Sequence, residues 1–302
     1  MKAFVIIATK GRPQETARLL DYLAVQTAPP AQIYVCGAGP ADIEPAARHS
    51  LAAAGIVKTS ISVHTGLTRQ RNAAVRQMLA DGADEGFAAF FDDDFVPAAS
   101  WLADCGEYFS TMPDVAALTG WVLADGVRRE AYTYDDADAY ISGERPAEEH
   151  WASGEAIRGV HSVYGCNMAV RLSVLRNCPF DERLPLYGWQ EDRDFTGQVR
   201  KHGRTIYAPR CRGVHLGVKG GRISGVRFGY SQVANPIYLL GKGTTSPRAA
   251  SWLVGRALAA NVIKTAVRRT KLFDYPGRLR GNALALVDLV RGRCVPERIL
   301  DL

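Results

Sequence analysis

Ala88–Val96 reads Ala-Ala-Phe-Phe-Asp-Asp-Asp-Phe-Val, and Phe87 precedes it. The five apolar residues Phe87–Phe91 form a short unbroken run, which is typical of a strand buried on both faces inside a parallel sheet. Three carboxylates follow at once. Because adjacent carboxylates repel one another and are costly to bury alone, the pattern predicts a positive partner. A divalent cation with oxygen ligands is the simplest partner, and an acidic turn before a helix near Pro97 is the alternative.

Strand and helix patterns alternate on both sides of this stretch. We therefore expect an α/β fold with a doubly wound, mostly parallel sheet, in which ligands bind at the carboxyl ends of the strands. The acidic, Tyr-rich segment 124–156 interrupts the alternation and is typical of a functional loop. The expected strands are Ala3–Ala8, Ile33–Cys36, Ile56–Val63, Phe87–Phe91, Val115–Val122, Val160–Val170 and Arg204–Ala208.

The chain has 302 residues, of which 47% are hydrophobic, and this is ordinary for a globular protein with a real core. Its six cysteines are scattered without a Cys-x-x-Cys pair, so they predict reduced thiols in a cytoplasmic protein. The first apolar run, Ala3–Ala8, is too short for the core of a signal peptide and is expected to be a strand.

The net charge of +6 belongs to the end of the chain, because residues 245–302 carry eleven Lys and Arg against four Asp and Glu. The near-neutral remainder disfavours a nucleic-acid binder. Trp252–Val267 is apolar but interrupted by Arg256 and Lys264, which suits a surface helix better than a membrane span. We expect a domain over 1–244 and a basic helical extension over 245–302. The extension predicts attachment to the anionic inner leaflet of the plasma membrane, and packing of its helices on the domain is the alternative.

Three further polar segments are candidates for ligand binding or catalysis. Thr9–Pro13 follows the first strand and places small and basic residues where a phosphate can bind, although an ordinary turn has the same pattern. Gly66–Asn72 offers two arginines to a diphosphate or to solvent. Trp189–Asp192 opens a helix with an acidic pair, which supplies either a general base or a complement to the helix dipole. His215 is either a metal ligand or a surface histidine.

Together these segments resemble family 2 glycosyltransferases, which have the GT-A fold. The similarity covers most of the chain and rests on the order of six motifs. These are Thr-Lys-Gly-Arg-Pro after the first strand, Gln-Thr-Ala-Pro-Pro, Arg-Gln-Arg-Asn at Arg69–Asn72, the three aspartates, Gly-Cys-Asn-Met at Gly165–Met168 and Trp-Gln-Glu-Asp at Trp189–Asp192. The basic segments Arg278–Asn282 and Arg291–Arg298 resemble those of bacterial members that build exopolysaccharide or lipid-linked glycans.

The resemblance implies a nucleotide-diphosphate sugar as donor and a glycan or lipid-linked sugar as acceptor, with inversion at the anomeric carbon. Thr9, Lys10 and Arg12 would line the nucleotide pocket, and Arg71 would contact the donor near its diphosphate. The second strand ends Val35–Gly39 with no acid before Asp42, whereas family members usually read the nucleobase with an aspartate there. The nucleobase is therefore left open.

The resemblance also implies a metal site and a base. Asp94 would bind Mg²⁺ or Mn²⁺ and His215 would complete its shell. Asp92 would face the ribose, with Asp93 beside it in the cofactor-binding set. Asp192 would take the proton from the acceptor hydroxyl, with Glu191 next to it.

Two other functions stay open. A nucleotidyltransferase would make a sugar nucleotide from a nucleoside triphosphate, but it would need a Gly-rich phosphate loop where Thr9–Pro13 stands. A non-catalytic nucleotide-sugar-binding protein would leave the coexistence of Asp192 and the aspartate triad without a reason.

Overall fold

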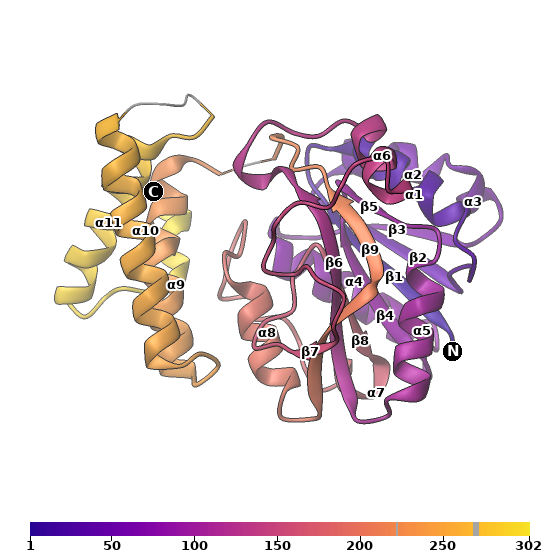
Figure 1. Cartoon of the computed structure of the whole chain (residues 1–302). Coiled ribbons are helices and arrows are strands. Elements are labelled where there is room, and N and C mark those ends of the chain that lie inside the picture. The colour runs from indigo at the N-terminus through magenta and orange to yellow at the C-terminus, as the bar shows by residue number, and fades with distance from the viewer. Residues whose placement is uncertain (222, 268–271) are drawn as a thin grey trace.

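The computed structural model describes residues 1–221, 223–267 and 272–302. Within these ranges, nine strands form one sheet with the order β3-β2-β1-β4-β8-β6-β9-β5, and β7 pairs with β9 (Figure 1). The strands are β1 Ala3–Thr9, β2 Gln32–Gly37, β3 Val57–Ile61, β4 Phe87–Asp92, β5 Phe95–Pro97, β6 Val115–Asp125, β7 Arg158–Gly159, β8 Asn167–Arg171 and β9 Arg204–His215. Strands β3, β2, β1 and β4 are mutually parallel, and β6 is parallel to β9, while β8, β5 and β7 pair antiparallel with their neighbours.

Helices cover both faces of the sheet. Buried side chains of α1 and α5 pack on one face, and those of α4 and α8 pack on the other. The helices are α1 Pro13–Ala24, α2 Pro40–Ala47, α3 Ser50–Ala53, α4 Leu67–Ala80, α5 Trp101–Thr111, α6 Tyr134–Ser142, α7 Leu172–Leu175, α8 Glu191–Val199, α9 Gly225–Lys242, α10 Pro247–Val267 and α11 Tyr275–Val290, with 3₁₀ turns η1 Gly126–Arg128 and η2 Pro296–Asp301. The predicted α/β fold with a mostly parallel sheet is therefore confirmed.

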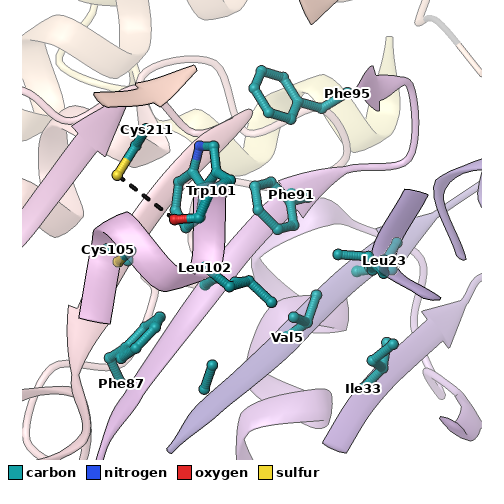
Figure 2. Packing of buried hydrophobic residues seen from close by; sticks show 14 of the residues in the cluster. Val5, Leu23, Ile33, Phe87, Phe91, Phe95, Trp101, Leu102, Cys105 and Cys211 are labelled. Atoms are coloured by element: carbon teal, nitrogen blue, oxygen red, sulfur yellow. Dashed lines mark hydrogen bonds between the residues drawn. The ribbon is translucent and has the colours of Figure 1, made fainter. Parts of the chain in front are cut away.

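The central strand β4 is buried on both faces, as its apolar run predicts. Phe87 and Phe91 lie in the core on the α1 and α5 side, whereas Phe90 lies in the core on the α4 and α8 side. The ring of Phe91 meets that of Trp101 edge-on, with centroids 4.7 Å apart (Figure 2). This packing fixes the strand end, and with it the position of the carboxylates that follow.

Strand β9 is longer than expected and brings His215 to the same edge. The sequence predicts a strand over Arg204–Ala208 and a Gly-rich loop around His215, but β9 runs to His215, which pairs in register with Phe95 of β5 and Asp125 of β6. Gly213 permits this pairing, because a Cβ atom there would lie 2.4 Å from the ring of Phe95.

The expectation of a strand over Val160–Val170 is wrong for its first half, because β8 begins at Asn167. Side chains take the backbone donors that a strand neighbour would otherwise satisfy. The N–H groups of Val163 and Tyr164 donate to Thr196 Oγ1 at 3.0 Å and to Thr119 Oγ1 at 3.2 Å. The loop that results carries Gly165 into the interior of the site.

The last three long helices pack on one another at one side of the sheet (Figure 1). Helix α9 faces α8 and the loop before it, since Lys242 Nζ lies 2.6 Å from Asp181 and 2.7 Å from Asp194. Asn235 Nδ2 also donates to the carbonyl of Trp189 at 2.8 Å. The predicted boundary after residue 244 falls between α9 and α10 and stays a prediction.

Tyr275-Pro276-Gly277 forms the first turn of α11. Asp274 caps that helix by accepting the N–H of Gly277 at 2.8 Å. Proline suits the first turn of a helix, where its missing N–H is not needed.

Candidate active site

Asp92, Asp94 and His215 converge at the carboxyl end of β4. Each offers one atom that could ligate a metal, and these atoms all lie within 4.8 Å of one another. His215 Nε2 is 3.3 Å from Asp94 Oδ1 and 3.9 Å from Asp92 Oδ2. The structure thus groups two carboxylates and one imidazole, and it places Asp92, which the resemblance assigns to the ribose, within this cluster.

Asp94 is held ionised inside the protein. Its Oδ2 accepts the N–H of Val218 at 2.8 Å and lies 2.8 Å from Arg12 Nη1. Burial opposes its charge, but His215 and Arg12 outweigh burial and lower the pKa of Asp94 to about 2. Its Oδ1 is buried and accepts no hydrogen bond of good geometry from the described residues. A buried carboxylate oxygen that accepts no well-formed hydrogen bond, with an imidazole nitrogen 3.3 Å away, fits a cation, so the residues present suit a divalent metal.

Arg12 supplies part of the positive charge that the three aspartates require. Its Nη1 bridges Asp93 Oδ1 at 3.0 Å and Asp94 Oδ2. The other two residues expected to contact the nucleotide differ in exposure. Thr9 is buried, and its Oγ1 accepts a hydrogen bond from the Thr16 hydroxyl at 2.9 Å, whereas Lys10 is exposed. Their contacts with a nucleotide stay predictions.

Arg71 is a buried link between the cluster and α8. It is 2% exposed, and its Nη1 lies 2.6 Å from Glu191 Oε1 while its Nη2 lies 3.0 Å from Asp92 Oδ1. Nη2 also donates to the carbonyl of Gly165 at 2.8 Å. Gly165 leaves room for this pair, since a Cβ atom there would lie 2.8 Å from Glu191 Oε1. Burial raises the pKa of Glu191, and the Arg71 guanidinium opposes that shift. These contacts show Arg71 fixing two acidic side chains, and a contact with the donor stays a prediction.

Asp192 stands next to Glu191 in the first turn of α8. Its Oδ2 accepts the N–H of Gly165 at 3.3 Å, and its Oδ1 accepts the N–H of Arg193 at 2.8 Å. Burial raises the pKa of Asp192, although these two hydrogen bonds oppose it. A carboxylate with a raised pKa is a better proton acceptor, as a general base must be.

The ends of β1 and β2 are fixed by two side chains to which the sequence assigns no role. Asp42 accepts the N–H groups of Gly11, Ala38 and Gly39 at 2.6, 3.0 and 2.9 Å. Gln70 donates to the carbonyls at the ends of both strands, at 2.7 and 2.9 Å. The first acid after the second strand is therefore occupied by the backbone.

Sequence reasoning missed three residues behind His215, which are Asp125, His150 and Tyr164. Asp125 Oδ1 lies 3.2 Å from His215 Nδ1. In the sequence Asp125 does not differ from the other acids of segment 124–156, and only its register with His215 across β6 and β9 distinguishes it.

Comparison with known proteins identifies relatives of this architecture. The model of "Glycosyl transferase family 2" matches residues 4–177, which is more than half of the chain. No curated protein sequence matches significantly. The crystal structure of S. aureus TarS 1-349 is similar with a TM-score of 0.59 and 16% identity, over 99% of this chain and 82% of that chain.

A structure of the same TarS segment in complex with UDP-GlcNAc has a TM-score of 0.57 and 18% identity, over 99% of this chain and 83% of that chain. The mannosyltransferase PcManGT from Pyrobaculum calidifontis, in complex with GDP-Man and Mn²⁺, has a TM-score of 0.56 and 17% identity, over 99% of this chain and 84% of that chain. At this identity the likeness concerns the fold, and the predicted GT-A type is confirmed.

Asp93 generates a prediction about stability and pH. Burial, with Asp94 beside it, raises the pKa of Asp93 to about 7, although Arg12 opposes the shift. A raised pKa means that the folded protein holds this proton more tightly than the unfolded chain, so the group lowers stability as pH rises from about 4 to about 7. In metal-free protein, Asp93→Asn should be more stable than wild type at pH 8, by about 1 kcal/mol or more, and the gain should vanish near pH 4.

Urea unfolding across this pH range measures the difference, with the exposed Asp84→Asn as control. A loss of stability in Asp93→Asn at pH 8, or a gain that does not change with pH, would show that folding does not raise the pKa of Asp93.

Proposed function

Because the chain belongs to glycosyl transferase family 2, we infer that it moves a sugar from a nucleotide-diphosphate donor to an acceptor hydroxyl, with inversion of the anomeric configuration. The observation that carries this proposal is a single connected site. The cluster of Asp92, Asp94 and His215 is joined to Asp192 through buried Arg71 and Gly165. This arrangement supports a binding site for the diphosphate and a general base for the acceptor hydroxyl along the same edge of the sheet.

Asp94 and His215, together with Asp92, would hold Mg²⁺ or Mn²⁺. When bound, such an ion stabilises the charge that develops on the leaving diphosphate. The imidazole nitrogen favours Mn²⁺ over Mg²⁺, because Mg²⁺ prefers oxygen ligands. PcManGT, whose structure contains Mn²⁺ and GDP-Man, supports this choice.

Asp192 is the proposed general base. The acceptor oxygen forms a bond with the anomeric carbon, the bond from that carbon to the diphosphate oxygen breaks, and the hydroxyl proton passes to Asp192. The nucleoside diphosphate leaves with the electron pair of the broken bond. Attack on the face opposite the leaving group inverts the anomeric centre. Glu191 acts next to it as the partner of Arg71, which keeps the first turn of α8 in place.

The donor pocket is proposed at the ends of β1 and β2. Arg12, beside Asp93, places a guanidinium where a phosphate can bind, and Lys10 adds an exposed cation. TarS and PcManGT were crystallised with UDP-GlcNAc and GDP-Man, so uracil and guanine are both bases for this chain to be tested with. Asp42 is held by three backbone N–H groups, which leaves recognition of the base to other groups of the pocket.

Replacing the base should stop transfer without preventing donor binding. Asp192→Asn cannot accept the proton, so we expect turnover to fall by ~10²–10⁴-fold. Nucleoside diphosphate release from UDP- and GDP-sugars, with glycan acceptors, measures transfer, and thermal shift with the matching diphosphate and Mn²⁺ measures binding.

The control is Glu107→Gln, which makes the same chemical change on the far helix α5 and should retain activity. Near-normal turnover in Asp192→Asn would overturn the base assignment.

We further propose that the extension attaches the enzyme to an anionic membrane surface, where a lipid-linked acceptor of polysaccharide synthesis would be found. No helix of the described residues is long and apolar enough to cross a membrane. Helix α10 nevertheless exposes Trp252 and Ile263 on one face, with exposed fractions of 61% and 60%. Arg256 lies between them in the helix and 4.6 Å from the Trp252 ring. An apolar stripe with an arginine is suited to anionic headgroups.

The packing of α10 and α11 on α9 bears on the alternative, in which the extension only packs on the domain. That packing buries Leu253, Ala257 and Asn261, which lie on the other face of α10. The two proposals therefore concern different faces of the same helix. The basic residues Arg268, Arg269 and Lys271 lie outside the described residues.

A charge placed on the exposed face of α10 should release the enzyme from membranes. We expect Trp252→Glu/Ile263→Glu to reduce sedimentation with phosphatidylglycerol-containing vesicles by about tenfold or more, and added salt to weaken wild-type binding. Val25→Glu/Val63→Glu adds the same charge at exposed valines of the α/β domain and should sediment like wild type. Equal sedimentation of all three proteins would show that α10 does not contact the membrane.

A further inference from the structure

We propose that Asp125 is a positioning residue, which holds the imidazole of His215 in the orientation that presents Nε2 to Asp92 and Asp94. The inference rests on the proposed function, since it concerns the metal site of that function. It adds to that site a carboxylate from β6, which contributes no ligand to the cluster itself.

The two nitrogens of His215 face different carboxylates. Nε2 points into the cluster, 3.3 Å from Asp94 Oδ1, while Nδ1 lies 3.2 Å from Asp125 Oδ1 on the opposite side of the ring. The distance between Nδ1 and Asp125 Oδ1 permits a hydrogen bond, although the direction of the N–H group falls short of good hydrogen-bond geometry. His215 is 6% exposed, so solvent has little access to compete for either nitrogen.

Asp125 is itself fixed from several sides. The N–H of Val127 donates to Oδ1 at 3.0 Å, and the hydroxyl of Tyr164 donates to Oδ2 at 2.9 Å. His150 Nε2 lies 3.4 Å from the same Oδ2. The strand register places Asp125 directly opposite His215, at the last residue of both strands. These contacts leave the carboxylate few alternative orientations.

Aromatic rings close the remaining space around the pair. The ring of Tyr164 meets His215 edge-on with centroids 5.9 Å apart, and it stacks on His150 at 5.6 Å. The imidazole therefore cannot easily turn about its bond to Cβ. Segment 124–156, which the sequence predicts to be a functional loop, supplies Asp125 and His150 and so supports the metal site.

The chemistry of metal-bound histidine explains what this arrangement achieves. Such a histidine commonly donates its second N–H to a carboxylate, which fixes the tautomer and the ring orientation. With the proton of the neutral ring at Nδ1 facing Asp125, the lone pair of Nε2 faces the cluster. The negative charge of Asp125 also makes Nε2 a stronger electron donor toward a cation.

A purely structural role is the competing explanation, because Asp125 also caps η1 through Val127. Metal affinity separates the two roles, since loss of a cap changes stability and leaves the intrinsic affinity of a folded metal site unchanged. The experiment is a calorimetric titration of Mn²⁺ into the metal-free full-length protein, with the unfolding midpoint of each variant measured in EDTA.

We expect Asp125→Ala to weaken Mn²⁺ binding by ~10–100-fold. Asp125→Asn keeps a carbonyl oxygen that accepts from Nδ1–H, so its loss should be smaller than that of Asp125→Ala. Tyr164→Phe keeps the ring and removes one donor to Asp125, and its loss should be smaller still. Asp114→Ala removes an aspartate just before the other end of β6, where it pairs with Arg204, and should bind Mn²⁺ like wild type.

Mn²⁺ affinity in Asp125→Ala equal to that of wild type would overturn the positioning role and leave the proposed function standing. Equal losses of Mn²⁺ affinity in Asp125→Asn and Asp125→Ala would also overturn it, because the acceptor oxygen that Asn keeps would then make no difference to the orientation of His215. Failure of wild type to bind Mn²⁺ would overturn the metal site together with this inference.

Discussion

Three adjacent carboxylates at the end of a buried strand impose the constraint on which the site depends. Asp93 and Asp94 are only 3% and 2% exposed, so water cannot solvate their charges. Positive groups must come from elsewhere in the chain. Arg12 reaches them from the turn after β1, Arg71 reaches Asp92 from α4, and His215 arrives at the end of β9. Parallel strands make this convergence possible, because their carboxyl ends share one edge of the sheet. The arginines do not contact Asp94 Oδ1, and this buried oxygen, which faces His215 Nε2 without a well-formed hydrogen bond, is where a cation fits.

Local sequence patterns predict the fold and the candidate site residues. They do not predict which of these residues contact one another. The apolar run of β4 has one physical explanation, so its burial on both faces was predictable. Arg71 has the same local pattern whether its helix face meets solvent or a buried glutamate, and only the approach of α8 decides between them. Asp125 becomes distinct through a strand pairing with His215, which lies far along the chain. Residues 160–166 have strand character, yet hydroxyls from β6 and α8 accept the backbone N–H groups of Val163 and Tyr164.

Helix α9 lies between the proposed base and the helical extension, whose helices α10 and α11 pack on it. Helix α9 contacts the loop before α8 and α8 itself, where Lys242 pairs with Asp181 and Asp194. Since Asp192 lies in the first turn of α8, the proposed base is held between the sheet and α9. Attachment of α10 to a membrane would thus place the acceptor side of the enzyme at a fixed relation to that surface.

The central claim is that the carboxylate cluster binds a cation together with the diphosphate of the donor. Calorimetric titration of UDP and GDP into metal-free protein, with and without Mn²⁺, tests it most directly. Binding of the two ligands must be reciprocal, so each should tighten the other by the same factor. We predict that Mn²⁺ strengthens binding of the matching nucleoside diphosphate by about tenfold or more in wild type, and that Asp94→Asn removes the effect. Nucleoside diphosphate binding that is equally tight without Mn²⁺, or a full Mn²⁺ effect in Asp94→Asn, would contradict the account.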